Sequence, residues 1–210
     1  MPAQAATIVS GVILAGGQSR RLGTDKAFLP ILGQPLVART VQKLAVLSDD
    51  VIVVTNEPAL YAALRLPVRL VGDELPGQGA LVGIYSGMKV ARHPQTLVVA
   101  CDMPFLCLPL LRYMTTLAAE YDVVIPELGG MFEPLHAVYG RACLQPMARL
   151  LAAGEHQIIA FFPEVRVRAI DQSEIDAFDP DRLSFLNVNT REDWERAQLI
   201  LAEAGLRDRA

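Results

Sequence analysis

The sequence contains little cysteine: Cys101, Cys107 and Cys143 are the only three in 210 residues. An odd, widely spaced set provides neither a disulfide framework nor the paired spacing of a zinc site. We therefore expect reduced thiols in a reducing compartment. For Cys101, at the end of an apolar strand pattern, a small buried apolar residue is the alternative to a thiolate.

Positive charge and long apolar runs are also scarce. The 19 Lys and Arg residues against 23 Asp and Glu give a formal net charge of -4, which argues against a protein that grips long nucleic acid. No apolar run reaches the length of a membrane span, and no basic residue precedes the apolar start, as it would in a signal peptide. We therefore predict a cytoplasmic protein that binds neither nucleic acid nor membrane.

The chain also lacks linkers, low-complexity tracts and internal repeats. Its 14 prolines and 15 glycines are spread along the sequence, and 52% of the residues are hydrophobic, enough for one substantial core. A single domain over residues 1–210 is the prediction.

What the sequence does contain is an alternation of strand-like and helical patterns. Short β-branched runs such as TIVSGVILA, DVIVVT and TLVVACD alternate with helical patterns such as PLVARTVQKLAVL. This alternation predicts an α/β fold, a doubly wound, mostly parallel sheet flanked by helices. Further on we expect an extended GGMFEPLHAVYG, a helix over CLQPMARLLAAG, a strand at VRVRAI and a strand end at LNVNT that feeds the last helix.

A glycine-rich segment, LAGGQSRRLGTDK, follows the first predicted strand, where doubly wound sheets hold phosphates. Gly16 and Gly17 let backbone amides approach an anion, while Arg20, Arg21 and Lys26 add positive charge. The spacing matches neither a Walker loop, which needs Gly-Lys, nor the dinucleotide fingerprint G-x-G-x-x-G. The alternative is a surface turn with solvated arginines.

Two aspartates end predicted strands that would reach the same edge of the sheet. Asp102 ends VVACD and Asp73 ends VRLVGD. Carboxylates there are well placed to hold a divalent cation against nucleotide phosphates, although either could simply cap a turn.

The second half of the chain offers histidine and asparagine candidates. His136, within EPLHAVY, could act as an acid or base, but a lone histidine in an apolar strand is more often a hydrogen-bonded structural residue. Asn189, in NVNT, could cap the last helix, with Glu192 three residues on.

The ordered series LAGG-x-S-x-R-x-G-x-DK, G-x-P-L, G-x-G-x-L-x-G-I, CDMP, EPLHAVY and NVNT resembles the molybdenum cofactor guanylyltransferases, a MobA-like nucleotidyltransferase family. The match runs from about Val12 to Trp194. One departure is Ala80, where the family usually has proline, which affects the loop near the guanine.

The resemblance implies a nucleotidyltransferase Rossmann-like fold and transfer of GMP from GTP to the terminal phosphate of molybdenum-bound molybdopterin. The products would be the molybdopterin guanine dinucleotide cofactor and pyrophosphate, with Mg²⁺ as cofactor. Molybdenum insertion proteins and apo-molybdoenzymes are the protein partners it suggests.

The resemblance also assigns roles to individual residues. It places the nucleotide in residues 1–105 and the acceptor in residues 106–210. The implied nucleotide-binding residues are Leu14, Ala15, Gly16, Gly17, Lys26, Asn56, Asp73 and Asp102, with Asn56 aligned less clearly than the others. The implied catalytic residues are Arg21, Lys26 and Asp102, with Asp102 as the metal ligand. The acceptor-binding candidates are Arg20, His136, Asn187 and Asn189.

Two rival interpretations stay open. The first is a nucleotidyltransferase with another substrate, such as a molybdopterin cytidylyltransferase or a sugar-phosphate enzyme. Cytidylyl relatives resemble LAAG where this chain has LAGG, so Gly16 favours guanine. The second is a non-catalytic carrier of the pterin cofactor, which the presence of both Lys26 and Asp102 disfavours.

Overall fold

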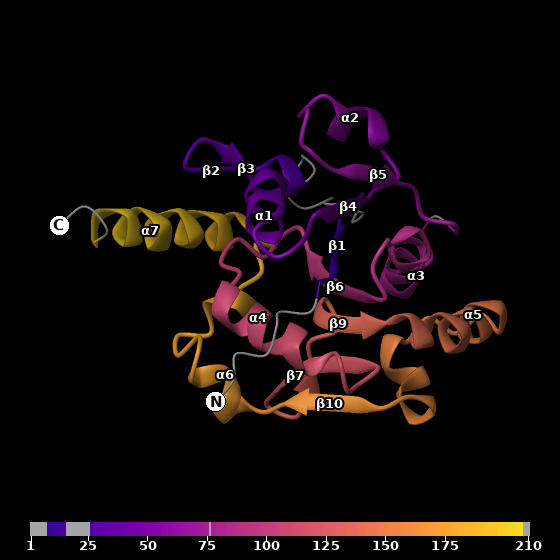
Figure 1. The fold of residues 1–210 in the computed structure, drawn as a ribbon. Coiled ribbons are helices and arrows are strands. Elements are labelled where there is room, and N and C mark those ends of the chain that lie inside the picture. Colours follow the sequence, from indigo (N-terminus) through magenta and orange to yellow (C-terminus); the bar gives the residue numbers. More distant parts are fainter. Residues whose placement is uncertain (1–7, 16–25, 76, 208–210) are drawn as a thin grey trace.

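The computed structural model describes residues 8–15, 26–75 and 77–207, with side chains to residue 203. In these ranges one sheet has the strand order β10-β7-β9-β6-β1-β4-β5, with β8 paired to β7 at its side (Figure 1). Its strands are β1 (Ser10–Leu14), β4 (Asp50–Val54), β5 (Arg69–Val71), β6 (Gln95–Ala100), β7 (Val123–Leu128), β8 (Met131–Phe132), β9 (His136–Gly140) and β10 (Val167–Ile170). A separate small hairpin pairs β2 (Pro30–Ile31) with β3 (Gln34–Pro35).

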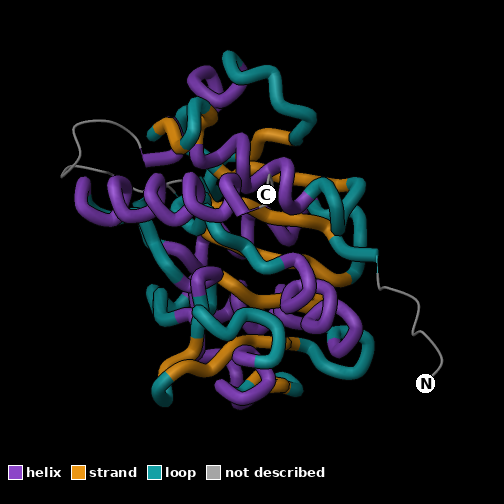
Figure 2. The backbone as a smooth tube through the Cα atoms, turned by 90° about the vertical axis from the view of Figure 1, so that its left-hand side faces the viewer, coloured by secondary structure: helices purple, strands orange, loops and turns teal. Residues whose placement is uncertain are grey.

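The centre of the sheet is parallel. Strand β1 pairs with β4 on one side and β6 on the other, and β4 pairs with β5, all in parallel register. All five residues of β4 are buried, which explains its unbroken apolar run, since a central parallel strand is covered on both faces. Figure 2 shows the strands following one another through the molecule with helices packed against them. The predicted doubly wound, mostly parallel α/β fold is confirmed.

Helices cover both faces of the sheet. In Figure 1, α1 (Leu36–Leu44), α4 (Leu108–Leu117) and α6 (Gln172–Asp176) lie on one side, and α3 (Ala80–Val90) and α5 (Leu144–Ala152) on the other. The buried residues form a separate cluster on each face. The remaining helices are α2 (Pro58–Ala62), α7 (Arg191–Arg207) and the short 3-10 turns Lys26–Phe28, Arg141–Cys143, Ile158–Glu164 and Leu183–Phe185.

Helix α3 approaches β1 unusually closely, because two of its residues lack a side chain. A Cβ at Gly87 would lie 2.7 Å from Cγ1 of Val12, closer than real contacts allow. A Cβ at Gly83 would lie 3.2 Å from Leu14 and 3.4 Å from Asp73. The first turns of α3 are thereby held against the carboxyl ends of β1 and β5.

Strand β9 departs from the parallel pattern. Gly129 and Gly130, with φ of +58° and +79°, make the tight turn between β7 and β8, as two consecutive glycines favour. The chain then returns as β9, which lies between β6 and β7 and is antiparallel to both. The prediction of one extended GGMFEPLHAVYG segment is therefore refined to a hairpin followed by a central strand.

The prediction of a strand end at LNVNT is wrong. The segment from Leu186 to Asn189 has no regular structure. Its one backbone hydrogen bond to the end of β6 joins the Val188 N–H to the Asp102 carbonyl at 2.9 Å. The apolar alternation of Leu186 and Val188 reflects burial of a loop, because Val188 shares a buried cluster with Ile31, Leu36 and Ala197, and Leu186 packs against it.

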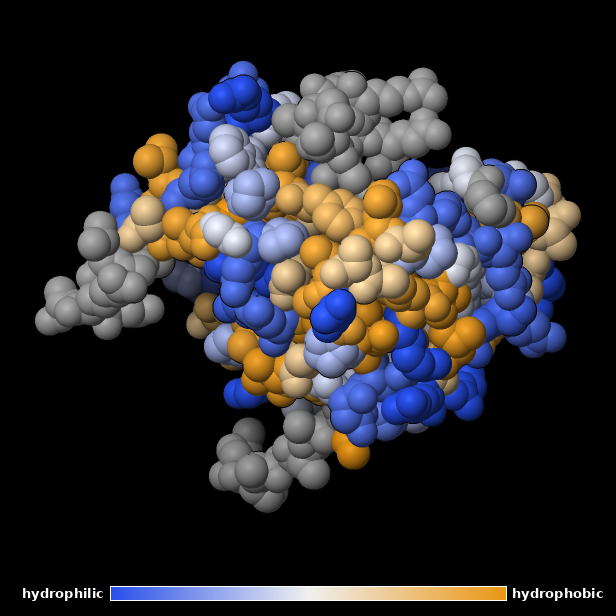
Figure 3. Space-filling model, turned by 90° about the horizontal axis from the view of Figure 1, so that it is seen from above, coloured by the Kyte–Doolittle hydropathy of each residue, from blue (hydrophilic) through white to orange (hydrophobic). Residues whose placement is uncertain are grey.

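The surface is mixed. Figure 3 shows polar and apolar residues side by side on the face seen from above. The large apolar side chains that stay exposed belong to separate elements, among them Leu32, Leu60, Met131 and Leu199. Within the described ranges, no helix has the length and apolar character required to cross a membrane.

Candidate active site at the carboxyl edge of the sheet

The carboxyl ends of β1, β4, β5 and β6 form one edge, and hydrogen bonds hold them in register beyond the strands themselves. The Ala15 N–H donates to the Val54 carbonyl at 2.9 Å, and the Cys101 N–H donates to the Leu14 carbonyl at 3.0 Å. Leu14 and Ala15 therefore lie at the middle of this edge, as the parallel sheet predicts.

Three polar residues distant in the sequence meet beside this edge, and we call them the Lys26 cluster: Lys26, Asp102 and Asn189. The Nζ of Lys26 lies 3.6 Å from Oδ2 of Asp102 and donates a hydrogen bond to Oδ1 of Asn189. The side chains of Lys26 and Asp102 are only 24% and 19% exposed. The cluster thus presents a cation and a carboxylate together in a largely shielded setting.

Burial controls the ionisation of Asp102. Desolvation raises the pKa of this carboxyl above its usual value, and the nearby Lys26 opposes the shift without cancelling it. Because burial destabilises the charged form of a carboxylate, a buried carboxylate gains more from a bound cation than an exposed carboxylate does. Mg²⁺ is commonly held by one or two carboxylates together with substrate phosphates, so Asp102 fits such an ion. Among the described residues, no three metal-ligating side chains gather in one group.

A second polar pair lies on the other side of β1. The amide of Asn56 donates to Oδ2 of Asp73 at 2.9 Å, and the Asp73 N–H donates back to Oδ1 of Asn56 at 3.1 Å. The other carboxylate oxygen of Asp73 is buried and has no hydrogen-bond partner in the described structure. The pair thus leaves one carboxylate oxygen of Asp73 as a free acceptor at the edge, and the predicted roles of Asn56 and Asp73 in nucleotide binding stay predictions.

The assignment of Asn189 as a helix cap is wrong by one residue. Thr190 caps α7: its Oγ1 accepts from the Asp193 N–H at 3.1 Å, and the Asp193 carboxylate accepts from the Thr190 N–H at 2.8 Å. This reciprocal pair is a capping box. The side chain of Asn189 is consequently available to Lys26, and Glu192 plays no part in the cap.

His136 is a core residue. It is 0% exposed, its ring packs 4.8 Å from that of Phe185, and neither ring nitrogen has a hydrogen-bond partner among the described residues. Burial lowers its pKa to about 4, so the imidazole is neutral at physiological pH and unsuited to acid–base catalysis. The structural interpretation fits better, except that the expected hydrogen bond is missing.

Two further polar side chains in the second half of the chain also lack partners among the described residues. Oδ1 of Asn187 is buried with no hydrogen-bond partner in the described structure. Glu133, half-buried at the start of the EPLHAVY motif, has a raised pKa that burial alone causes. Sequence reasoning selected Asn187 but not Glu133. A charged residue placed between an aromatic residue and a proline in an apolar motif is the signal that could have identified it.

Four of the predicted site residues lie outside the described ranges: Gly16, Gly17, Arg20 and Arg21. Their predicted contacts with nucleotide and acceptor stay predictions. Lys26, at the end of the same glycine-rich segment, opens a short 3-10 turn and is the first of its charged residues that the structure places.

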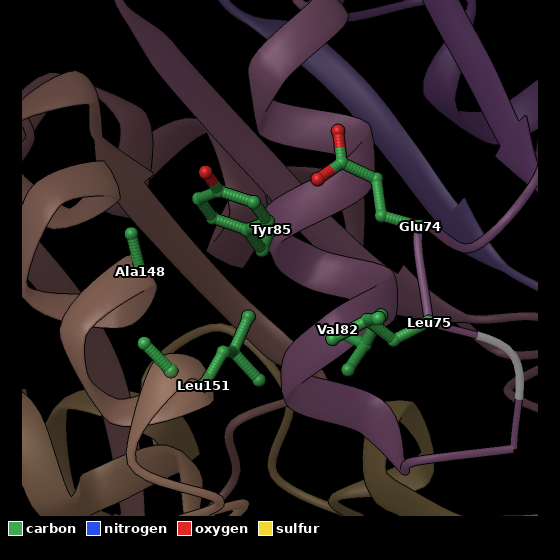
Figure 4. A pocket seen from close by; sticks show the side chains of 7 residues that line it. Glu74, Leu75, Val82, Tyr85, Ala148 and Leu151 are labelled. Atoms are coloured by element: carbon green, nitrogen blue, oxygen red, sulfur yellow. The ribbon is translucent and has the colours of Figure 1, made fainter.

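A separate groove lies between α3 and α5 (Figure 4). Its walls are mostly apolar, with Val82, Tyr85 and Leu151 facing one another and Glu74 at the rim. It shares no residue with the Lys26 cluster or with the Asn56 and Asp73 pair. The polar groups at the strand ends, rather than this groove, are therefore the candidate site.

Comparison with known proteins shows the family to which the chain is similar. The model of the MobA-like NTP transferase domain matches residues 11–168. A molybdenum cofactor guanylyltransferase of Desulfosudis oleivorans is 38% identical over 195 residues, covering 92% of this chain and 96% of that protein. Molybdopterin-guanine dinucleotide biosynthesis protein A of Archaeoglobus fulgidus is 25% identical with a TM-score of 0.81, covering 93% of this chain and 100% of that one. A Mycobacterium tuberculosis protein solved in complex with manganese shares the fold at 19% identity and a TM-score of 0.66, covering 91% of this chain and 98% of that one.

Proposed function

The chain belongs to the MobA-like NTP transferase family and is a nucleotidyltransferase, and from this premise we propose its reaction. It transfers GMP from GTP to the terminal phosphate of molybdenum-bound molybdopterin in the cytoplasm. The products are the molybdopterin guanine dinucleotide cofactor and pyrophosphate. The observation that carries the proposal is the Lys26 cluster, which combines a cation, a shielded carboxylate and an amide at the edge where nucleotides bind in such folds.

The proposed chemistry needs positive charge rather than a base. An oxygen of the acceptor phosphate forms a bond to the α-phosphorus of GTP, and the bond from that phosphorus to the oxygen bridging the β-phosphate breaks. Because the attacking oxygen is already anionic, no proton has to be removed. The neutral, buried His136 is consistent with this, since the site then has no need of a catalytic imidazole.

Repulsion between two polyanions is the main obstacle to this reaction. The ammonium of Lys26 is placed to neutralise charge on the GTP phosphates, held in position by the Asn189 amide. A divalent cation on Asp102 would supply further positive charge at the α-phosphate. Arg21 is proposed to act with Lys26 on the departing pyrophosphate.

The sheet suggests how the two substrates divide the edge. Asn56 and Asp73 follow β4 and β5, on one side of Asp102, and we assign them with Leu14 and Ala15 to the nucleotide. The elements on the other side of Asp102, β9 and the segment at Asn187, belong to the acceptor half. This corresponds to the predicted halves 1–105 and 106–210.

The test is a comparison of four nucleotides. Purified protein with Mg²⁺ and molybdenum-loaded molybdopterin should release pyrophosphate from GTP and much more slowly from CTP, ATP or UTP. A preference for CTP would retain the chemistry and refute the argument from Gly16. Binding of molybdopterin without turnover of any nucleotide would favour the carrier interpretation.

Alanine at Asn189 should reduce activity but not stability, whereas alanine at the neighbouring Thr190 should reduce stability but not activity. Asn189→Ala removes the acceptor that holds Lys26, so we expect pyrophosphate release to fall by about tenfold with little change in stability. Thr190→Ala removes the cap of α7 and should lower the free energy of unfolding by about 1 kcal/mol, with activity nearly retained. Urea unfolding and steady-state rates on both variants provide the comparison. Loss of stability in Asn189→Ala equal to that in Thr190→Ala would refute the assignment.

A further inference from the structure

The loop Glu133–Leu135 reaches the same edge as the Lys26 cluster. Because β9 runs antiparallel to β6, the residues that precede β9 lie beside the carboxyl end of β6. Ala100 lies two residues before Asp102, and its N–H donates to the Leu135 carbonyl at 3.1 Å. The loop is therefore part of the site edge, on the side away from β1.

The backbone around Glu133 is fixed from both directions. Its N–H donates to the Pro126 carbonyl at 3.0 Å, and its carbonyl accepts from the His136 N–H at 3.0 Å. The buried ring of His136 packs against Phe185, on the chain segment that continues to Asn189. The position of Glu133 is thus coupled to the segment that supplies part of the Lys26 cluster.

Although the backbone of Glu133 is fixed, its carboxylate has no partner in the described structure. It is half-buried, and no cation or hydrogen-bond donor in the described structure pairs with its side chain; burial alone accounts for its raised pKa. Other shielded carboxylates of the protein are paired, such as Asp50 with Arg69 and Glu174 with Arg168. A shielded, unpaired carboxylate is unfavourable unless a ligand supplies donors. The unpaired Oδ1 of Asn187 on the neighbouring segment is a second acceptor without a donor.

The chemistry of the acceptor decides which part of it such a carboxylate can face. On the proposed function, the acceptor has an anionic phosphate, an anionic molybdenum–dithiolene end and a pterin ring. A carboxylate repels the first two. The pterin has one donor-rich edge, where an exocyclic amino group stands beside a ring N–H, and two adjacent donors match the two oxygens of a carboxylate.

We propose that Glu133 binds the amino and ring N–H donors of the pterin in the acceptor substrate, and so selects a pterin over other pteridines. This inference rests on the proposed function for the identity of the acceptor. Guanine carries the same pair of donors, but the residues assigned to the nucleotide follow β1, β4 and β5, whereas Glu133 precedes β9 on the far side of β6. The pterin is therefore the ligand that the topology favours.

The test converts one hydrogen-bond acceptor of the Glu133 side chain into a donor. Glu133→Gln keeps the shape but replaces one acceptor with an N–H₂ donor. The probes are hydroxymethylpterin phosphate and hydroxymethyllumazine phosphate, in which an oxygen replaces the pterin amino group. Both rings fluoresce, so their dissociation constants can be measured without nucleotide or turnover. The wild-type protein should prefer the pterin by about tenfold or more, and Glu133→Gln should lose or reverse this preference.

Control measurements separate the possible failures. Glu120→Gln, the same change at an exposed position before the amino end of β7, should leave both affinities unchanged. The GTP affinity of Glu133→Gln should equal that of the wild type, and a fall in GTP affinity instead would overturn the proposal by assigning Glu133 to guanine. Pterin binding that Glu133→Gln leaves unchanged would overturn this inference alone. Failure of the wild-type protein to bind the pterin phosphate would also overturn this inference, whereas the proposed function would be overturned only by a lack of turnover with molybdenum-loaded molybdopterin.

Discussion

We expect Asp102→Asn to lower pyrophosphate release from GTP by about a thousandfold, the scale at which removing one charged group slows phosphoryl transfer. The asparagine keeps the shape of the side chain but removes the negative charge that would hold a divalent cation. Raising the Mg²⁺ concentration should therefore restore little of the lost activity. Steady-state rates over a range of Mg²⁺ concentrations measure both effects.

The same substitution should not destabilise the protein. Burial raises the pKa of Asp102 in the folded chain, so over the pH range between the unfolded and folded values the folded chain holds a proton that the unfolded chain has released. Stability therefore falls as the pH rises through that range, and at neutral pH the ionised group opposes folding. The Tm of Asp102→Asn at neutral pH should equal or exceed that of the wild type. Asp181→Asn, at an exposed position, serves as the control, and a clear fall in Tm would show that Asp102 is structural.

We expect Lys26→Met to lower kcat/KM for GTP by about a hundredfold to a thousandfold, because one of the cations that face the phosphates is lost. Unlike Asp102→Asn, this change should also reduce stability, since it leaves a shielded carboxylate without its neighbouring cation. It should also raise the pKa of Asp102 further. As the pH is lowered, the remaining activity should therefore disappear at a higher pH than in the wild type. Lys43→Met, on α1, is the control.

A double substitution tests whether Lys26 and Asp102 act as a unit. If they do, Lys26→Met combined with Asp102→Asn should be more stable than Lys26→Met alone, and its activity should be little lower than that of Asp102→Asn. Additive losses of activity would show that the two residues act on separate steps. Urea unfolding and single-turnover rates on the four proteins complete the cycle.

The sequence predicted the parallel part of the fold better than the remainder. Central strands such as β4 are buried on both faces, and continuous apolar runs identify them locally. The direction and position of β9 depend on its pairing with β6 and β7, which no local pattern encodes. The glycine pair at 129 and 130 is a local signal for the turn between β7 and β8, but it says nothing about where the chain goes after β8.

Within the site, residues at the ends of parallel strands were the predictable ones. Asp73 and Asp102 follow apolar strands, so the sheet itself implies a common edge. Asn189 lies 163 residues from Lys26 in the sequence, and only the family resemblance suggested that it belongs there. The capping error had a definite cause: Asn189 with Glu192 and Thr190 with Asp193 both satisfy the capping-box spacing, and tertiary contacts select the second pair.

The position of β9 also determines how the chain can assemble. This strand is made after β6 and β7 but lies between them, so β7 cannot join the sheet until residues 136–140 have been inserted. While the chain is still emerging from the ribosome, β6 has an apolar edge with unpaired backbone groups, which invites pairing with other chains. A fragment that ends near residue 105 would expose that edge permanently. A fragment of residues 1–105 is therefore expected to aggregate when made alone, even though its own parallel strands are contiguous in the sequence.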